Sequence, residues 1–358
     1  MKVLALTEGA DHVCYRYRIE AFAGALAERG ALLHTLPLAS STWGRLQQFR
    51  QARRADVVIL QRKLLPIWQL RLLRRTARRL IYDFDDALFH RDSYSRKPAE
   101  SWTRLSRFWA TVYAADLVVA GNEYLAERAR AYVEPERVAV LPTCVTPRFY
   151  PLARHERQGE GIELVWIGQH STLPSLSQAE ACLSAAAGAV AGLGLRVICD
   201  RFPRLCGIPV RPVQWSRGSE AANIAAADIG VNWLPDDPWS RGKCGLKVLQ
   251  YMSAGLPVVG NPVGMNREMI RHGETGFLAG TPEEWSDAVR RLADCAALRR
   301  RMGAAARAMV CGHYSVERWS ERFAELVLGT PRTFNAERPR LDVAARSSQP
   351  TTWVEAAA

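Results

Sequence analysis

Short apolar segments alternate with helical segments along the amino-terminal half of this 358-residue chain, from Val3–Leu6 to Val138–Leu141. A connection long enough to hold a helix lets the two strands that it joins run parallel, with helices on both faces of the sheet. The expected strands are 3–6, 32–36, 57–60, 79–84, 117–120 and 138–141, and the expected helices are 19–29, 41–53, 67–79, 102–114 and 123–133. This alternation restricts the fold class to α/β.

The carboxyl-terminal half repeats the pattern, and 358 residues fit two domains better than one. Its expected strands are 162–167, 195–200, 210–215, 229–233 and 257–259, and its expected helices are 219–227, one opening near 245, 282–294, 296–311 and 315–328. We therefore expect a first domain at 1–150, a polar linker at 151–161 and a second domain at 162–312, followed by a terminal helix within 313–330. The polar, aperiodic segment 331–358 is expected to be a disordered tail.

Cysteine usage and apolar runs indicate the compartment. Eight cysteines are scattered without Cys-x-x-Cys pairs or histidine partners, which argues against a zinc site or a disulfide framework and fits a reducing cytoplasm. The start, Met1-Lys-Val-Leu-Ala-Leu-Thr7, is too short for a signal peptide and is typical of a strand. No apolar run approaches the ~20 residues that a membrane-spanning helix requires. We expect a cytoplasmic protein that is soluble or bound peripherally to the inner face of the membrane.

The net charge of +12 is concentrated between Arg45 and Arg79, where eleven basic residues accompany a single acid, Asp56. Such a segment would bind an anionic membrane surface, where a lipid-linked acceptor would lie, with ~1 kcal/mol for each basic residue near the lipid. Nucleic acid is less favoured, because neither interleaved aromatic residues nor a known nucleic-acid module accompanies the charge. The remaining alternative is a solvated helical surface in an arginine-rich chain.

One stretch of the second domain combines the features of an anion site. Gly242-Lys-Cys-Gly245 ends a polar loop between an apolar strand and the helix that opens near Gly245. Glycines let the backbone approach a ligand, and the free N–H groups and dipole of the helix point back into the loop. Lys243 and Lys247 add charge suited to a diphosphate. The alternative is a tight strand-to-helix turn with two solvated lysines.

Polar residues also follow expected strands of the first domain, and ligands of parallel sheets bind at the carboxyl ends of the strands. We take Gly9, Arg16, Asp83 and Asn122 as residues of an acceptor-side site, with Asp83, Asp85 and Asp86 as candidates for binding hydroxyl groups or accepting a proton. The three carboxylates would also suit a divalent cation or a phosphatase-type loop, but neither is favoured. In the structural alternative these acids cap a turn and pair with nearby arginines, and Arg16 begins a solvated helix.

The run Gly242-Lys-Cys-Gly-Leu-Lys-Val-Leu-Gln-Tyr-Met-Ser-Ala-Gly-Leu-Pro-Val-Val259 resembles the donor-sugar motif of glycosyltransferase family 4, an arm of the GT-B enzymes. The following residues 261–270 and His272-Gly-Glu-Thr-Gly-Phe-Leu278 also fit, and the resemblance extends more weakly to the amino half. It implies two Rossmann-like domains facing across a cleft, with the nucleotide sugar on the second domain and the acceptor on the first. It also implies that helix 313–330 packs back on the first domain.

The resemblance assigns donor-binding residues to the second domain. They are Gly168, Gln169, His170, Ser171, Asp200, Arg201, Lys243, Cys244, Gly245, Leu246, Lys247 and Gln250. Two family glutamates are replaced here, by Gly242 and Gln250, and the arginine that normally follows the first glycine loop is replaced by Gln169. An amide can still hydrogen-bond hydroxyl groups, whereas glycine offers no side chain to a sugar.

The implied reaction is glycosyl transfer from a nucleotide sugar to a glycan, a lipid-linked sugar or a small molecule, with retention at the anomeric carbon. The pattern identifies no enzymic nucleophile, so Asp83, Asp85, Asp86 and His170 remain catalytic candidates. Neither a metal nor another cofactor is expected. The alternatives are a glycosyltransferase-like scaffold that lost its chemistry with the two glutamates, and a sugar-nucleotide epimerase of the same architecture.

Overall fold

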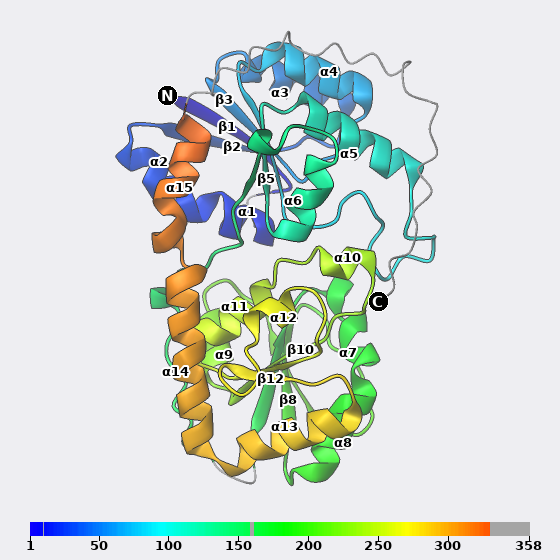
Figure 1. The fold of residues 1–358 in the computed structure, drawn as a ribbon, viewed down its shortest axis with the longest axis vertical. Helices are drawn as coiled ribbons and strands as arrows, with labels where there is room; N and C mark the ends of the chain where they lie inside the picture. The colour runs from blue at the N-terminus through cyan, green and yellow to red at the C-terminus, as the bar shows by residue number, and fades with distance from the viewer. Residues whose placement is uncertain (10, 158–160, 330–358) are drawn as a thin grey trace.

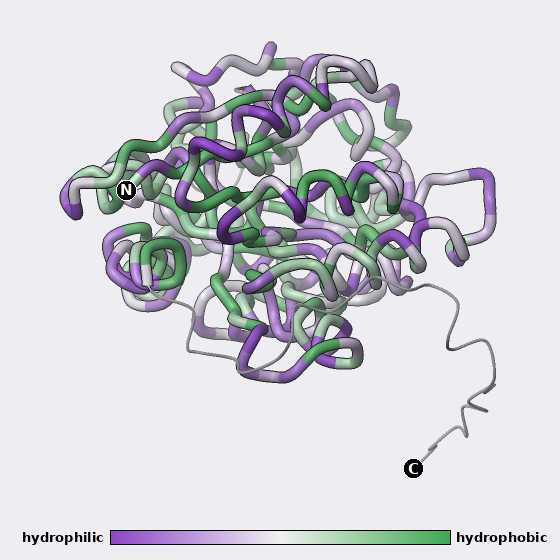
Figure 2. The backbone as a smooth tube through the Cα atoms, turned by 90° about the horizontal axis from the view of Figure 1, so that it is seen from above, coloured by the Kyte–Doolittle hydropathy of each residue, from purple (hydrophilic) through white to green (hydrophobic). Residues whose placement is uncertain are grey.

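The computed structural model describes residues 1–9, 11–157 and 161–329, which form two α/β domains stacked along the long axis (Figure 1). The expected disorder of 331–358 and part of the expected linker lie outside the described residues. Hydrophobic segments lie mainly in the interior of the molecule, and hydrophilic segments lie mainly in the outer turns (Figure 2). Among the described helices, none combines the length and apolar character needed to cross a membrane.

The amino-terminal domain is built on a six-stranded sheet of order β2-β1-β3-β4-β5-β6. Its strands are β1 Lys2–Thr7, β2 Leu32–Pro37, β3 Val57–Gln61, β4 Leu80–Phe84, β5 Leu117–Ala120 and β6 Val138–Val140. Every pairing is parallel, as the alternation predicted. The carboxyl ends of its strands therefore share one edge, which faces the other domain.

Helices cover both faces of this sheet with separate apolar clusters. One face carries α3 Thr42–Ala52, α4 Ile67–Thr76, α5 Trp102–Ala114 and α6 Glu123–Arg130, and the other carries α1 Val13–Arg18, a short helix Glu20–Phe22 and α2 Ala23–Glu28. The final helix, α15 Val316–Leu328, packs on this second face, where the rings of Phe22 and Phe323 stack with centroids 4.6 Å apart. The end of the chain thus completes the core of its first domain.

The carboxyl-terminal domain holds a second parallel sheet of order β12-β11-β10-β7-β8-β9. Its strands are β7 Glu163–Ile167, β8 Gly194–Cys199, β9 Val210–Gln214, β10 Ile229–Asn232, β11 Val258–Gly260 and β12 Gly276–Leu278. Its helices are α7 Pro174–Gln178, α8 Glu180–Ala189, α9 Glu220–Ala225, α10 Pro238–Arg241, α11 Leu246–Ser253, α12 Met265–Met269, α13 Pro282–Asp294 and α14 Ala296–His313. Two Rossmann-like domains therefore face each other, as expected.

The sequence analysis missed the strand β12 and the helices α1, α7, α8, α10 and α12, and it placed the ends of α4 and α6 three residues too late. In α8 the run Ala-Cys-Leu-Ser-Ala-Ala-Ala is made of small residues and shows little polar–apolar periodicity, although Leu183 and Ala186 are buried. Helix α4 ends at Thr76 because Ala77 already has extended backbone angles and leads into β4. These differences do not affect the prediction of parallel sheets, because every strand pairing in both sheets is parallel.

A buried ion pair fixes α1 to the end of β4. Arg18 donates to the carboxylate of Asp83 through Nη2 at 2.5 Å and Nε at 3.0 Å, and to the carbonyl oxygen of Leu141 at 2.9 Å. Gln61 donates to the same carboxylate at 3.3 Å. Both charged side chains are nearly inaccessible to solvent, so each depends on the other for its stabilisation.

We predict that Asp83→Ala lowers the free energy of unfolding by about 3–5 kcal/mol, because it leaves the Arg18 guanidinium buried without its counter-charge. Urea unfolding followed by circular dichroism measures the loss. The matched control is Glu321→Ala, which breaks the exposed Arg29–Glu321 pair at 3.7 Å and should cost about 0–1 kcal/mol. Equal losses in the two variants would contradict a structural role for Asp83.

Candidate functional site

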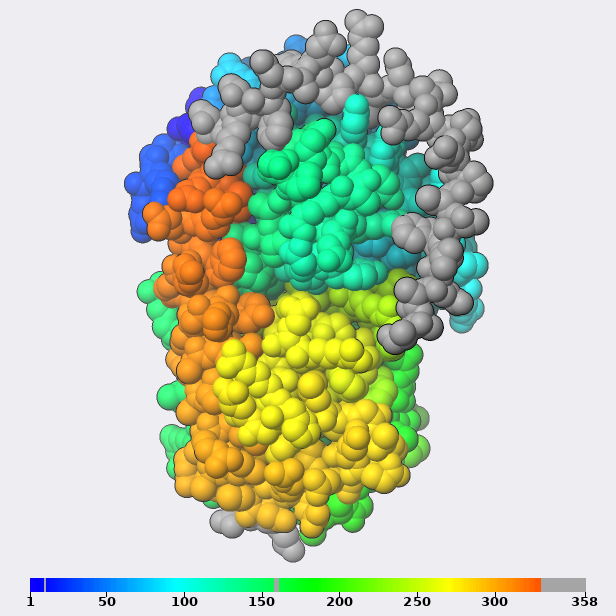
Figure 3. Space-filling view, viewed as in Figure 1, coloured from blue at the N-terminus to red at the C-terminus, as the bar shows by residue number. Residues whose placement is uncertain are grey.

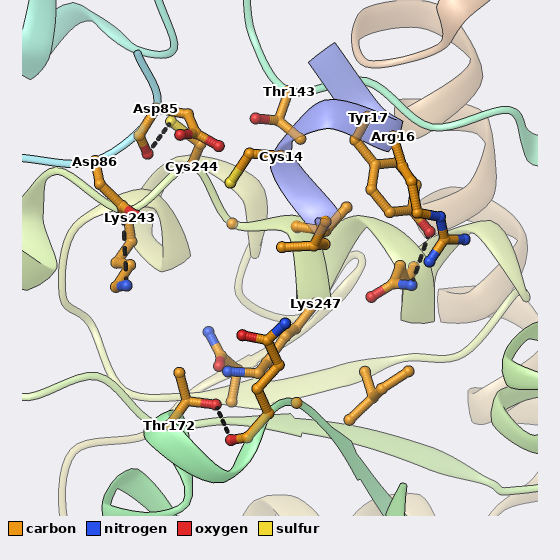
Figure 4. Close-up of a pocket in the computed structure, with 18 of the residues that line it drawn as sticks. Cys14, Arg16, Tyr17, Asp85, Asp86, Thr143, Thr172, Lys243, Cys244 and Lys247 are labelled. Carbon is orange, nitrogen blue, oxygen red and sulfur yellow. Dashed lines mark hydrogen bonds and ion pairs between the residues drawn. The ribbon is translucent and has the colours of Figure 1, made fainter. Parts of the chain in front are cut away.

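A cavity of about 460 Å³ opens between the domains at the facing carboxyl ends of the two sheets (Figure 4). The first domain contributes Asp11, Val13, Cys14, Arg16, Tyr17, Asp85, Asp86 and Thr143. The second contributes Ile167, Gly168, Gln169, His170, Thr172, Asp200, Trp215, Glu220, Asn232, Leu234, Lys243, Cys244, Gly245, Leu246, Lys247 and Gln250. The domains touch beside this cavity, and α14 and α15 run along one side of both (Figure 3).

The glycine loop is held against the first domain. The Cys244 thiol lies 3.3 Å from the backbone oxygen of Asp85, and a side chain at Gly121 would meet its sulfur at 2.4 Å. Asn122 caps α6 and donates to the backbone oxygens of residues 242 and 243 at 3.3 and 3.2 Å. Gly245 adopts a left-handed φ of 67°, which turns the chain into α11. Gly121 and Asn122 therefore position the loop.

Position 242 has no room for the family glutamate in this arrangement. A β-carbon at Gly242 would lie 2.8 Å from the β-carbon of Ala87 and 2.9 Å from its backbone nitrogen. These are contacts to another domain, so a larger residue would require the two domains to move apart. The glycine at this position accompanies a tight approach of the loop to the end of β4.

The two lysines of the loop have different surroundings. Lys247 Nζ lies 4.8 Å from the centroid of the Trp166 ring and is half-buried. Burial, and then the charge of Lys243, lower the pKa of Lys247 to about 7. Lys243 reaches across the cleft, with Nζ 3.3 Å from Oδ1 of Asp86 (Figure 4). An entering anion would favour the charged form of Lys247 and compete with Asp86 for Lys243.

Arginines pair with all three candidate carboxylates of the first domain. Arg62 Nη1 contacts the carboxylate of Asp85 and lies 2.6 Å from Oδ2 of Asp86. Burial alone would raise the pKa of Asp85, but the positive charges of Arg62 and Arg18 outweigh it and lower the pKa. Asp85 is therefore ionised at neutral pH and tied to a cation, which makes it a weak proton acceptor.

Asp83 does not line the cavity, in contrast to the acceptor-side role expected for it. Its carboxylate is buried inside the amino-terminal domain, in the ion pair with Arg18. This pairing with an arginine is the structural alternative that the sequence analysis left open for Asp83. Asp86 is better placed, because it faces the cavity between Arg62 and Lys243. Among the described residues, no three His, Cys, Asp or Glu side chains gather as metal ligands.

Gln250, at the position of the second family glutamate, is buried in a hydrogen-bonded cluster between the domains. Its Nε2 donates to the hydroxyl oxygens of Tyr17 at 3.1 Å and Tyr150 at 3.3 Å. These two hydroxyl groups are 3.0 Å apart. The amide thus joins α11 to α1 and to the segment that leaves the first domain.

Glu220, which the sequence analysis did not identify, supplies a carboxylate beside this amide. It accepts from Arg16 Nη2 at 2.7 Å, from the Tyr17 hydroxyl at 3.0 Å and from Trp215 Nε1 at 2.7 Å. Burial raises the pKa of Tyr17, so its hydroxyl keeps the proton that it donates. The only sequence signal for Glu220 is an acid in the first turn of a helix, which usually indicates no more than helix capping. Arg16 is therefore paired with Glu220 and is not a free phosphate ligand in this state.

His170 has a partner that the sequence did not reveal. Its Nδ1 lies 2.7 Å from Oδ2 of Asp200, and its backbone N–H donates to Oδ1 at 2.9 Å. This hydrogen bond from His170 lowers the pKa of Asp200 to about 2, and both residues line the cavity. The pair lies at the end of β7 and β8, on the side of the cleft formed by the carboxyl-terminal domain.

The structure brings most of the predicted site residues together. Gly168, Gln169, His170, Asp200, the run 243–247 and Gln250 line the cavity from the second domain, and Arg16, Asp85 and Asp86 line it from the first. Within the described part of the chain, Gly9, Ser171, Arg201 and Asn122 are not among the lining residues. For Asn122 the reason is its bond to the glycine loop.

Comparisons with known proteins agree with this architecture. Residues 238–309 match the family model described as glycosyl transferases group 1. Sucrose-phosphate synthase from Thermosynechococcus elongatus superposes with a TM-score of 0.71 at 16% identity, covering 91% of this chain and 98% of that one. HepE from Anabaena, solved in complex with UDP-glucose, gives 0.66 at 14% identity over 91% and 98%. No curated protein matches this chain.

A third solved structure, the lipopolysaccharide outer core galactosyltransferase WaaB, gives a TM-score of 0.63 at 11% identity, covering 91% of this chain and 99% of that one. These identities are low, so the superpositions compare folds and not individual contacts. The matched family segment contains the glycine loop, α11 and the strand that follows it. The chain therefore has a GT-B-type fold, and the segment that matches the group 1 glycosyl transferase model lies on the carboxyl-terminal side of the cleft.

The Glu220 carboxylate yields a prediction about domain contact. Glu220→Gln should lower the free energy of unfolding by about 3 kcal/mol, because it leaves Arg16 poorly compensated in a site with little solvent. Glu20→Gln is the matched control, since it weakens another contact between the domains, the exposed Arg217–Glu20 pair, and should cost about 0–1 kcal/mol. Equal urea midpoints for the two variants would refute the role of Glu220.

Proposed function

We propose that the protein is a glycosyltransferase of the family 4 type that moves a sugar from a nucleotide-sugar donor to a glycan, lipid-linked or small-molecule acceptor, with retention. One observation carries this proposal. The segment that matches the group 1 model folds as a strand, a glycine loop and a helix, and its amides and two lysines face a cleft between Rossmann-like domains. The proposal also includes the catalytic candidates Asp83, Asp85, Asp86 and His170, and it includes the expectation that the reaction requires no metal.

The donor diphosphate would lie at the amino-terminal end of α11. The free N–H groups and the dipole of that helix favour a negative charge, and Lys247 and Lys243 supply the cations. Uridine is the first base to test, because HepE, one of the similar folds, was solved with UDP and with UDP-glucose. Trp215 borders the same cavity and offers an aromatic surface on which a base could stack.

In the proposed reaction the acceptor hydroxyl oxygen forms a bond to the anomeric carbon while the bond from that carbon to the β-phosphate oxygen breaks. The hydroxyl proton passes to the departing phosphate oxygen, on the face from which the nucleoside diphosphate leaves. Lysine charges, loop amides and the helix dipole stabilise the negative charge that develops there. Asp86 faces the same space from the first domain and would hold the acceptor hydroxyl.

Donor binding is predicted to take up protons. Near pH 8, a Lys247 with a pKa of about 7 is mostly neutral in the free protein. A bound diphosphate favours its charged form, so affinity should rise as the pH falls from about 9 to about 7. Calorimetric titration with UDP-, GDP- and dTDP-sugars, repeated in buffers of different ionisation enthalpy, measures both the affinity and the protons taken up.

The control is Lys247→Met, which should bind the same donor at least about tenfold more weakly and without the proton uptake. Binding with no turnover of the donor under an acceptor screen would support the scaffold alternative. Conversion of the donor sugar without an acceptor would support the epimerase. Absence of binding to every donor would reject the proposed function.

The Lys243–Asp86 contact predicts opposite effects on the two substrates. Asp86→Asn removes the anion that competes for Lys243, so a nucleotide diphosphate should bind about three- to tenfold more tightly. The same change should reduce turnover with an acceptor, because the amide is a poor partner for a hydroxyl proton. Asp85→Asn is the control, since Asp85 pairs with Arg62, whereas Lys243 pairs with Asp86. Unchanged or weaker diphosphate binding by Asp86→Asn would argue against this competition.

A further inference from the structure

Three neighbouring helices on one face of the amino-terminal domain contain no acidic residue. Helices α3, α4 and α5 cover the same sheet face, and α4 contacts both of the others (Figure 1). Together they carry seven arginines: Arg45, Arg50, Arg71, Arg74, Arg75, Arg104 and Arg107. Most helical surfaces carry charges of both signs, so a surface of three helices with arginines and no acidic residue is unusual.

Each of the three helices also exposes a tryptophan in its first turn. The exposed fractions are 64% for Trp43, 50% for Trp68 and 82% for Trp102. These helices follow β2, β3 and β4, and helices that cross over between parallel strands begin at the carboxyl edge of the sheet. The three indole rings therefore lie at the same, amino-terminal end of their helices. Trp43 is contacted by Arg50, whose guanidinium lies 5.9 Å from the centroid of its ring, and a large part of each of the three rings remains in solvent.

Only some of the basic residues in the segment Arg45–Arg79 contribute to the exposed positive charge. Arg62 and Arg74 pair with carboxylates, and Arg79 donates to backbone oxygens at the end of α15. The outward charge comes instead from Arg50, Arg53, Arg54 and Arg75. The acids nearest in sequence are Asp56 and Asp116, which pair with Arg78 and Arg74, and Asp92 and Glu100 in the loop before α5.

We infer that the outer surface of α3, α4 and α5, here called the Trp–Arg surface, docks on an anionic lipid bilayer. Indole rings favour the boundary between headgroups and acyl chains, and arginines bind lipid phosphates. The positive charge complements an anionic leaflet. Each of the three rings lies at the start of a different helix, and such separated anchors suit a flat membrane surface better than a closed groove in a protein. That docking brings the cleft to a lipid-linked acceptor rests on the proposed function, whereas docking itself does not.

The test is flotation of the full chain with vesicles of phosphatidylcholine alone or mixed with phosphatidylglycerol. The wild-type protein should float only with the anionic vesicles, and added salt should weaken this binding. Trp68→Ala/Trp102→Ala and Arg50→Glu/Arg75→Glu should each reduce the bound fraction at least about tenfold. The matched controls are Phe202→Ala and Arg301→Glu, exposed residues of the other domain that should leave binding unchanged.

Calorimetric donor binding by the same preparations shows that the variants are folded and tests the proposed function separately. Wild-type protein that stays with the unbound fraction would overturn the inference, as would tryptophan variants that float like the wild type. Retention on duplex DNA that is stronger than vesicle binding, and is lost only in the arginine variant, would also overturn it in favour of a nucleic-acid partner. Loss of vesicle binding in the tryptophan and arginine variants alone, with donor binding preserved, supports it.

Discussion

The cleft owes its present shape to a carboxylate buried between the domains. Glu220, at the start of α9, is bonded to Arg16 and Tyr17 of α1, and these residues are about 200 positions away in the chain. Removing two charges from water is costly, and the cost is offset here because every oxygen of the carboxylate has a donor. Such a contact defines one relative position of the two domains and would resist small displacements from it.

A second set of charges links the two sides of the cavity. Lys243 extends from the glycine loop to Asp86, and Asp86 shares Arg62 with Asp85. An anion that attracts Lys243 would leave Asp86 with less positive charge around it. The carboxylate would then become a better acceptor of a hydrogen bond from a hydroxyl group. The two sides of the cleft are thus connected through one side chain, without any movement of the backbone.

Most of the strands and the place of the glycine loop could be predicted because they depend on local patterns. Apolar runs, intervening helices and glycines are all visible within short windows of sequence. The partners of charged residues could not be predicted, since they are set by tertiary distance. Asp200 was visible at a strand end but its bond to His170 was not, and Asp83 looked like a ligand although Arg18 neutralises it beneath the cleft. Glu220 had only the signature of an acid in the first turn of a helix, which does not distinguish a buried partner of Arg16 from a helix cap.

Gly242 and Gln250 stand where the resemblance to family 4 places two glutamates, and their surroundings explain both residues together. Gly242 lies against Ala87, where a carboxylate side chain would push the loop away from β4. Gln250 donates to two tyrosine hydroxyl groups beside Glu220, and a glutamate there would place a second negative charge next to the first. Like charges in a site with little solvent repel strongly. The chain therefore keeps one carboxylate in this region, contributed by α9 in place of α11, and both replacements are consistent with the close approach of its two domains.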